Sequence, residues 1–213
     1  GTTAKTNAMG LLSKLDFVHT PLPESQYFQE IMSKHAIVLH HTGSGGSPAG
    51  DVTWWNQTLA RIATCVIIGR SGEVYQCFSS RYWAYHIGAQ HPNNMWLQRH
   101  TIGVELDNWG PLTETRHGLQ AWNGAIVQPE GAVHYQDGYR GYKWYERYTQ
   151  RQLDTLGILL TYWSKQYKIP LDYDADMWDV NTQALEGKGG VWGHISYRPD
   201  KSDPHPQPEL IDL

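Results

Sequence analysis

Ala36-Ile37-Val38-Leu39-His40-His41 carries the clearest fold signal in the chain. A run of apolar residues followed by the Gly- and Ser-rich segment 42–50 favours a buried central strand. Side chains of a strand alternate between its two faces, so His40 and His41 point in opposite directions. We expect His40 to reach a cleft at the carboxyl end of the strand, where open α/β sheets bind ligands. His41 is expected to make structural hydrogen bonds on the other face.

Further strands are predicted on both sides of this stretch. Segments 63–68 and 73–78 form a hairpin pattern around the Gly-bounded turn 69–72. An apolar strand is predicted over 101–107, and a short strand over 191–193 precedes the proline-rich end of the chain.

One long amphipathic helix is predicted between Thr149 and Pro170. Thr149 and Gln152 match a capping box, and Pro170 cannot continue the helix. Its apolar face is formed at spacings of three and four residues by Leu153, Leu156, Leu160, Trp163 and Tyr167. Shorter helical segments are predicted at 27–32, at 54–57 with Asp51 or Thr53 as its cap, and from Pro208.

The order of these elements predicts an α/β fold with a central mixed β-sheet flanked by helices. We interpret residues 1–34 as a polar N-terminal arm and residues 35–213 as a single domain. Residues 108–148 are rich in Trp, Tyr and Gly and are interpreted as a β-rich insertion, with a hairpin signal at Asn123-Gly124.

Composition excludes some classes of partner. The 213 residues carry a formal net charge of −4 and no run of Lys or Arg, which argues against nucleic acid. No apolar stretch approaches the roughly 20 residues of a membrane span. Ten Trp and thirteen Tyr suit a half-wet ligand groove, although packing under loops explains single cases equally well.

Cys65 and Cys77 flank the predicted hairpin and would face each other across it. A cross-strand disulfide and two buried free thiols are both compatible with this spacing. We favour free thiols, since the chain has only these two cysteines.

The segment Gly193–Pro206 contains His194, Lys201 and Asp203 and is interrupted by three prolines, so an ordered loop is expected. Together with His40, this loop offers two nitrogens and one oxygen to a zinc ion and leaves a fourth position open, as in catalytic sites. Glu105 lies within the apolar strand 101–107, where a carboxylate is costly unless it is paired or faces a polar cleft. Most buried histidines are hydrogen-bonded core residues, so the spacing of these residues alone does not decide whether they bind a metal.

Four motifs in order resemble those of the type 2 zinc-dependent N-acetylmuramoyl-L-alanine amidases, which are related to phage T7 lysozyme and the peptidoglycan recognition proteins. The matching segments are Ile37–Thr42, Tyr85-His-Ile-Gly88, Ile102-Gly-Val-Glu-Leu106, and Gly193-His194 with Lys201-Ser-Asp-Pro204. The similarity covers about residues 35–106 and 149–210; the insertion matches no part of the family pattern.

The resemblance implies hydrolysis of the amide between N-acetylmuramic acid and L-alanine of peptidoglycan. It implies a zinc ion on His40, His194 and Asp203 that lowers the pKa of bound water toward ~7. Glu105 would act as general base and then general acid, with a pKa raised by its apolar strand. Lys201 would stabilise the oxyanion.

The substrate groove is expected to include His86, which contacts substrate rather than metal. Four aromatic residues are candidates to stack on sugar rings, with packing under the loop as an equal alternative for each: Trp83, Tyr85, Trp54 and Trp109.

Two departures from the family pattern bear on the metal. The gap from His194 to Lys201 is one residue shorter than in the bacterial cytosolic and lipoprotein members. His205 replaces the family's glycine after Asp-Pro, so another imidazole is expected near the metal.

An active peptidoglycan amidase is the favoured hypothesis, because the three ligands, Glu105 and Lys201 are all present. The alternatives are a non-catalytic peptidoglycan-binding module and a zinc hydrolase of another acyl-amino acid amide. We expect a monomer that acts in the cell wall or periplasm. No signal peptide is visible, which fits a phage or prophage endolysin or a leader that has been removed.

Overall fold

A central six-stranded sheet organises the computed structural model, which describes residues 10–213. The strand order is β1-β4-β3-β5-β2-β11, and all neighbours are parallel except the antiparallel pair β3 and β4. The strands are β1 (Phe17–His19), β2 (Ala36–His41), β3 (Val66–Ile68), β4 (Val74–Gln76), β5 (Thr101–Leu106) and β11 (Gly190–Gly193). The predicted mixed sheet is therefore confirmed. Part of the segment interpreted as an arm, 17–19, is an edge strand of this sheet.

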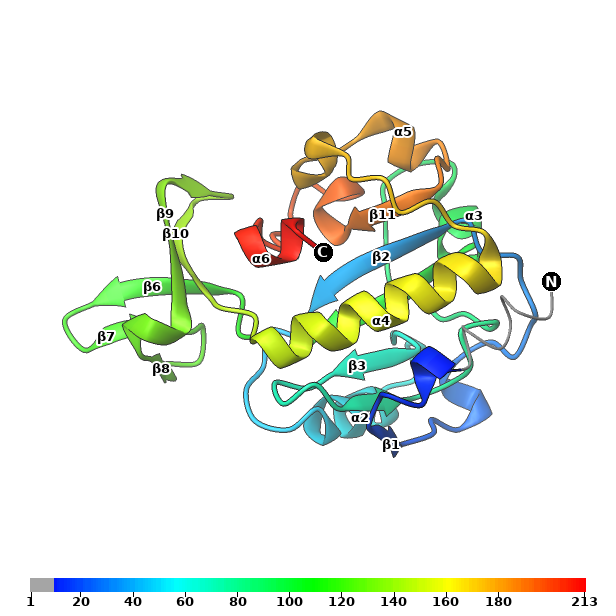
Figure 1. The fold of residues 1–213 in the computed structure, drawn as a ribbon, viewed down its shortest axis with the longest axis horizontal. Helices are drawn as coiled ribbons and strands as arrows, with labels where there is room; N and C mark the ends of the chain where they lie inside the picture. Colours follow the sequence, from blue (N-terminus) through cyan, green and yellow to red (C-terminus); the bar gives the residue numbers. More distant parts are fainter. Residues whose placement is uncertain (1–9) are drawn as a thin grey trace.

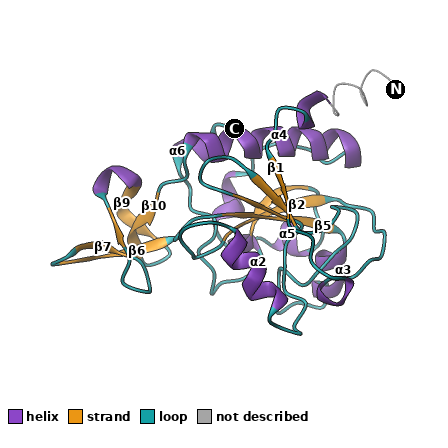
Figure 2. Cartoon of the chain, turned by 90° about the horizontal axis from the view of Figure 1, so that it is seen from below, coloured by secondary structure: helices purple, strands orange, loops and turns teal. Residues whose placement is uncertain are grey.

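Helices cover both faces of the sheet. The long helix α4 (Gln150–Tyr167) crosses one face, while α2 (Ala49–Asn56) and α3 (Asn94–Arg99) lie on the other (Figures 1 and 2). Shorter helices are α5 (Thr182–Leu185) and α6 (Pro208–Ile211), and single 3-10 turns are η1 (Glu24–Gln26), η2 (Pro129–Gly131), η3 (Ala175–Trp178) and η4 (His194–Ser196). Within residues 10–213 no helix has the length and apolarity needed to cross a membrane.

The alternation along β2 decides which face holds the histidine. Ile37 and Leu39 belong to the main apolar core with Leu156 of α4. Val38 packs on the other face, in a cluster that includes Leu97 of α3. His40 continues the Val38 side, since strand side chains alternate with a period of two. The imidazole is thereby placed on the face away from α4.

The start of α4 connects the helix to the strand ends. Thr149 Oγ1 accepts a hydrogen bond from Gln152 N, as the capping box predicts. The Gln152 side chain does not reach back to Thr149, so the second half of the predicted box is wrong. Its amide instead donates to the carbonyl oxygens of Ile68 and Asp107 at 2.9 and 3.0 Å, which lie at the end of β3 and directly after β5.

The predictions of turns and short helices were less accurate than the prediction of the central sheet. The turn 69–72 is confirmed, and the two cysteines face each other with Cys77 N donating to Cys65 O at 2.8 Å, both as buried free thiols. The helical turn predicted at 27–32 is wrong, since a 3-10 turn precedes it and the chain then pairs with Trp83. Helix α2 begins at Ala49, five residues before the predicted start, with no side-chain cap.

The segment 108–148 forms a second sheet of five strands in the order β8-β7-β6-β10-β9. It projects to the left of the main sheet in Figure 1 and has a small apolar cluster of its own around Leu112 and Leu119. Its turn at Asn123-Gly124 joins β7 to β8 as predicted. The strands are β6 (Pro111–Thr115), β7 (Gly118–Gln120), β8 (Ile126–Val127), β9 (Ala132–Tyr139) and β10 (Tyr142–Glu146).

Lys34 is a buried cation whose removal should destabilise the fold. Its Nζ donates to the carbonyl oxygens of Tyr82, Arg99 and Thr101 at 2.7, 2.9 and 3.3 Å. Burial lowers the pKa of Lys34 to about 8, which still leaves the ammonium protonated at neutral pH. Lys34→Met should lower the free energy of unfolding by about 3 kcal/mol or more, since each buried acceptor left without a donor costs about 1–3 kcal/mol.

Urea denaturation of the Lys34 variant at pH 7 measures this cost. Lys165→Met is the matched control, because Lys165 lies exposed on α4. Equal unfolding midpoints for the two variants would contradict the structural role of Lys34.

Candidate metal centre

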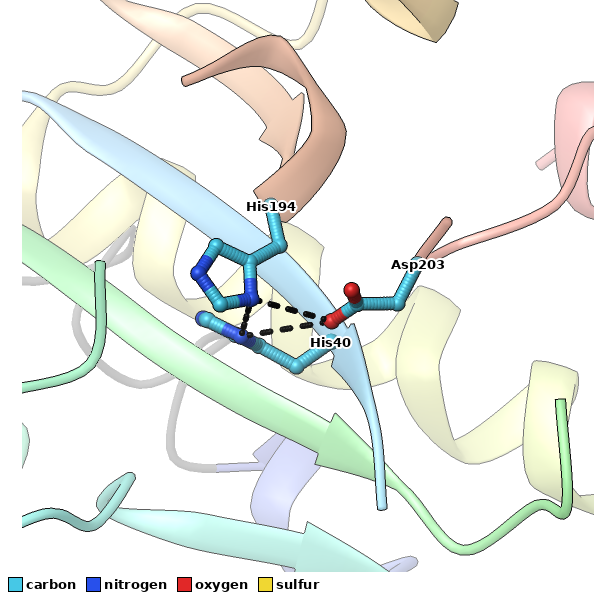
Figure 3. A group of neighbouring side chains, drawn as sticks. All are labelled: His40, His194 and Asp203. Carbon is cyan, nitrogen blue, oxygen red and sulfur yellow. Dashed lines mark hydrogen bonds and ion pairs between the residues drawn. The ribbon is translucent and has the colours of Figure 1, made fainter. Parts of the chain in front are cut away.

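Three distant parts of the chain bring His40, His194 and Asp203 together. His40 comes from the carboxyl end of β2, His194 begins η4 directly after β11, and Asp203 lies in the following loop. Strands β2 and β11 are parallel neighbours, so their carboxyl ends open on the same edge of the sheet. All three residues are buried, and Figure 3 shows their side chains converging on one point.

The distances between the three ligand atoms fit a small cation. His40 Nδ1 and His194 Nδ1 are 3.1 Å apart, and Asp203 Oδ2 lies 3.5 Å from the first and 3.2 Å from the second (Figure 3). Bonds of about 2.0–2.1 Å to a tetrahedral metal ion would place ligand atoms about 3.3 Å apart. The three side chains therefore have the spacing of a shared ion and occupy one side of its coordination sphere.

The charges and tautomers at the centre also suit a cation. His194 Nε2 lies 2.7 Å from the carbonyl oxygen of Ile87, which can only accept, so Nε2 carries a proton and Nδ1 is the nitrogen that faces the other two ligand atoms. Burial, and then His194, lower the pKa of His40 to about 4, so this imidazole is neutral. Burial alone would raise the pKa of Asp203, but His194 and His40 hold it well below the usual range. The ring nitrogens of His40 and His194 and the carboxylate oxygen of Asp203 therefore face one another, an arrangement that a cation would stabilise.

Glu105 lies beside this centre because of strand register. It pairs with His40 across the parallel strands β5 and β2, and paired residues project from the same face. Burial, followed by the charge of Asp203, raises the pKa of Glu105 well above its usual value, while Lys201 acts in the opposite direction. Among the described residues no partner hydrogen-bonds Glu105 Oε2. A buried carboxylate oxygen in this state is suited to take a proton from water.

A cleft of about 370 Å³ opens onto these groups, and Lys201 and Glu105 both line it. Of the predicted substrate contacts, Tyr85 and His86 line the cleft as well. Trp55 and Ile62 also line it and were missed by the sequence reasoning. Because Trp55 neighbours Trp54 on α2, the pattern indicated an aromatic residue here but not which one.

The other three predicted aromatic contacts lie elsewhere. Trp83 is 3% exposed and stacks on Phe28 with ring centroids 4.0 Å apart, so it is a packing residue in this structure. Trp109 packs over Gly45, where an added Cβ would lie 2.4 Å from the indole. Trp54 is 69% exposed on α2 and is not among the residues that line the cleft.

His205 is buried but directed away from the three ligand atoms. Its Nδ1 lies 2.6 Å from the Tyr135 hydroxyl, and its Nε2 lies 2.7 Å from the carbonyl oxygen of Glu146. Tyr139 donates to the neighbouring Pro204 oxygen at 3.1 Å. His205 therefore offers no free nitrogen to a metal, because both of its nitrogens connect the loop to the second sheet.

Comparison with known proteins agrees with this geometry. The N-acetylmuramoyl-L-alanine amidase family model matches residues 32–206, which include the whole centre. The chain belongs to this amidase family. No curated protein sequence matches the chain significantly.

Solved structures similar to this amidase share its fold. PlyL has 13% identity and a TM-score of 0.51, covering 87% of this chain and 84% of its own. The catalytic domain of XlyA has 12% identity and a TM-score of 0.52, covering 89% and 90%. A selenomethionine derivative of AmpD has 17% identity and a TM-score of 0.50, covering 92% and 89%. At such low identity these structures support the architecture alone.

Proposed function

We propose that this amidase hydrolyses the amide between the lactyl group of N-acetylmuramic acid and L-alanine in peptidoglycan, with Zn²⁺ held by His40, His194 and Asp203. The observation that carries it is the convergence of two imidazole nitrogens and one carboxylate oxygen beside Glu105, whose Oε2 has no hydrogen-bond partner in residues 10–213. Two nitrogens and one oxygen are a common ligand set of catalytic zinc. A bound zinc ion polarises a carbonyl and lowers the pKa of water at the open position.

The protein's own groups supply the proton transfers. Glu105 takes a proton from the attacking water as its oxygen bonds to the amide carbon, and later gives that proton to the leaving nitrogen of alanine as the C–N bond breaks. Lys201 lines the same cleft, and its ammonium is the proposed stabiliser of the negative charge that the carbonyl oxygen gains. The cleft admits the stem peptide, with Tyr85 and Trp55 on its wall.

The proposed acting unit is a monomer at the cell wall, with residues 35–213 as one catalytic domain and 108–148 as its insertion. A phage or prophage lysin is the setting we favour. Expression with and without a pore-forming protein tests this setting, because a lysin without its own export needs the pore to reach the wall.

Release of soluble stem peptides from purified cell walls tests the reaction itself. New amino termini should be alanine, a chelator should stop their appearance, and added zinc should restore it. Wall binding without such release would favour the alternative, a non-catalytic peptidoglycan-binding module. Cleavage of other acyl-amino acid amides, but not of cell walls, would favour the other alternative, a zinc hydrolase with a different amide substrate.

The acid limb of the activity should depend on Lys201. Glu105 must be ionised to act as a base, and the Lys201 charge lowers the pKa of Glu105 against the larger effect of burial. Lys201→Met removes that charge, so the pKa rises and kcat/KM is lost at higher pH than in the wild type. Profiles of kcat/KM against pH measure this shift separately from the fall in kcat. Lys143→Met, on the exposed part of β10, should leave the profile in place; an acid limb at unchanged or lower pH in Lys201→Met would refute the coupling.

A further inference from the structure

The nitrogen of His40 that faces away from the centre begins a chain of hydrogen bonds that ends in the backbone. His40 Nε2 lies 3.1 Å from His86 Nδ1, and His86 Nε2 lies 3.0 Å from Thr101 Oγ1. Thr101 Oγ1 in turn lies 2.6 Å from the carbonyl oxygen of Leu97. The three side chains come from β2, from the loop before α3 and from the start of β5, and the chain of bonds ends on α3.

The direction of every bond in this chain is determined from its far end. A carbonyl oxygen only accepts, so the single hydroxyl proton of Thr101 is donated to Leu97 O. Thr101 Oγ1 must then accept from His86, which places the His86 proton on Nε2. A neutral imidazole carries one ring proton, so with that proton on Nε2 the Nδ1 of His86 is an acceptor. His40 therefore has to donate from Nε2.

We propose that His86 and Thr101 are positioning residues that hold His40 in the Nε2–H tautomer, with its Nδ1 lone pair aimed at the metal. The role rests on the proposed metal centre. Ligating histidines are generally fixed by a carboxylate, a carbonyl or water on the second nitrogen. His194 follows that rule through Ile87 O, whereas His40 uses a neutral imidazole in the same place.

Gly103 provides the space in which this histidine lies. A Cβ built on Gly103 would be 2.8 Å from His86 Nδ1 and 2.8 Å from Thr64 Cγ2. The rings of His40 and His86 have centroids 5.3 Å apart and meet at 63°, an edge-on contact that directs the nitrogen of one toward the other. Any larger residue at 103 would displace His86 from the acceptor position. The need for this space explains why glycine occupies position 103 of the segment Ile102-Gly-Val-Glu.

Zinc affinity of the full chain, measured by competition with a chelator, tests the proposal through paired variants. His86→Leu should bind zinc about 10–100-fold more weakly, the usual cost of losing such a partner. His86→Asn should bind nearly as well as the wild type, since the amide oxygen can replace the Nδ1 acceptor. Thr101→Val should weaken binding, and Thr101→Ser, which keeps the hydroxyl, should restore it.

Nitrogen-detected NMR of the metal-free protein gives an independent readout, because it reports which ring nitrogen of His40 carries the proton. The proposal requires Nε2. A His40 proton on Nδ1, or wild-type zinc affinity in His86→Leu, would overturn it. The substrate-contact role predicted for His86 instead gives a raised KM with unchanged zinc affinity. If the wild type bound no zinc, the proposed function would fail, while the tautomer measurement would still decide the role of His86.

Discussion

Glu105→Gln is expected to reduce amide cleavage by about 10²–10⁴-fold, the usual contribution of a positioned general base. The amide keeps the size of the side chain and can still contact water, but it cannot take up the proton. The buried Glu105 Oε2 has no hydrogen-bond partner among the described residues, so no such bond competes with proton uptake at this oxygen. Initial rates of stem-peptide release at fixed wall concentration measure the loss.

Two controls make the Glu105 result specific. Glu114→Gln changes an exposed glutamate on β6 and should leave the rate unchanged. Zinc content of Glu105→Gln should equal that of the wild type, because Glu105 is outside the group of three converging ligand atoms. A Glu105→Gln enzyme that cleaves walls at the wild-type rate would remove the proposed general base.

Asp203→Ala is expected to abolish stoichiometric zinc binding and to lower activity by about 10³-fold or more. The ion contributes several kcal/mol of transition-state stabilisation, and each 1.36 kcal/mol is a factor of ten in rate. Asp203 supplies the one carboxylate among the three ligands, so the two imidazoles that remain form a weaker site. Equilibrium dialysis followed by metal analysis measures the stoichiometry.

Thermal unfolding separates metal loss from misfolding in the Asp203 variant. Zinc should raise the Tm of the wild type, since a ligand that binds only the folded state stabilises it by about 2.7 kcal/mol at 100 times Kd. The variant should unfold normally without metal and show no such rise. Asp154→Ala, an exposed change on α4, should behave as the wild type in both measurements. A zinc-dependent Tm rise retained in Asp203→Ala would exclude Asp203 as a ligand.

The sequence predicted the parts of the centre that depend on local periodicity. Alternation along residues 36–41 correctly assigned the metal-facing position to His40. The structural hydrogen bonds expected of His41 are wrong, because its buried Nδ1 has no partner among the described residues and His41 also lines the cleft. The helix at 150–167 and the strand at 101–106 follow from apolar spacing in the same way. Motif order then connected His40 with His194 and Asp203, which the structure brings within hydrogen-bonding distance.

What the sequence could not supply depends on contacts between distant segments. Glu105 lies beside His40 because of the register between β5 and β2, and no pattern within either strand determines that register. The direction of His205 depends on Tyr135 of the second sheet, seventy residues earlier. Gln152 was read as a capping residue because its two real acceptors, at the ends of other strands, are invisible in a helix pattern.

An anomalous difference map at the zinc absorption edge, from crystals grown with one equivalent of zinc, tests the metal centre most directly. The account predicts one peak per chain, bonded to Nδ1 of His40, Nδ1 of His194 and a carboxylate oxygen of Asp203, with a fourth ligand that is not a protein side chain. A peak elsewhere, or a fourth protein ligand that closes the coordination sphere, would contradict it.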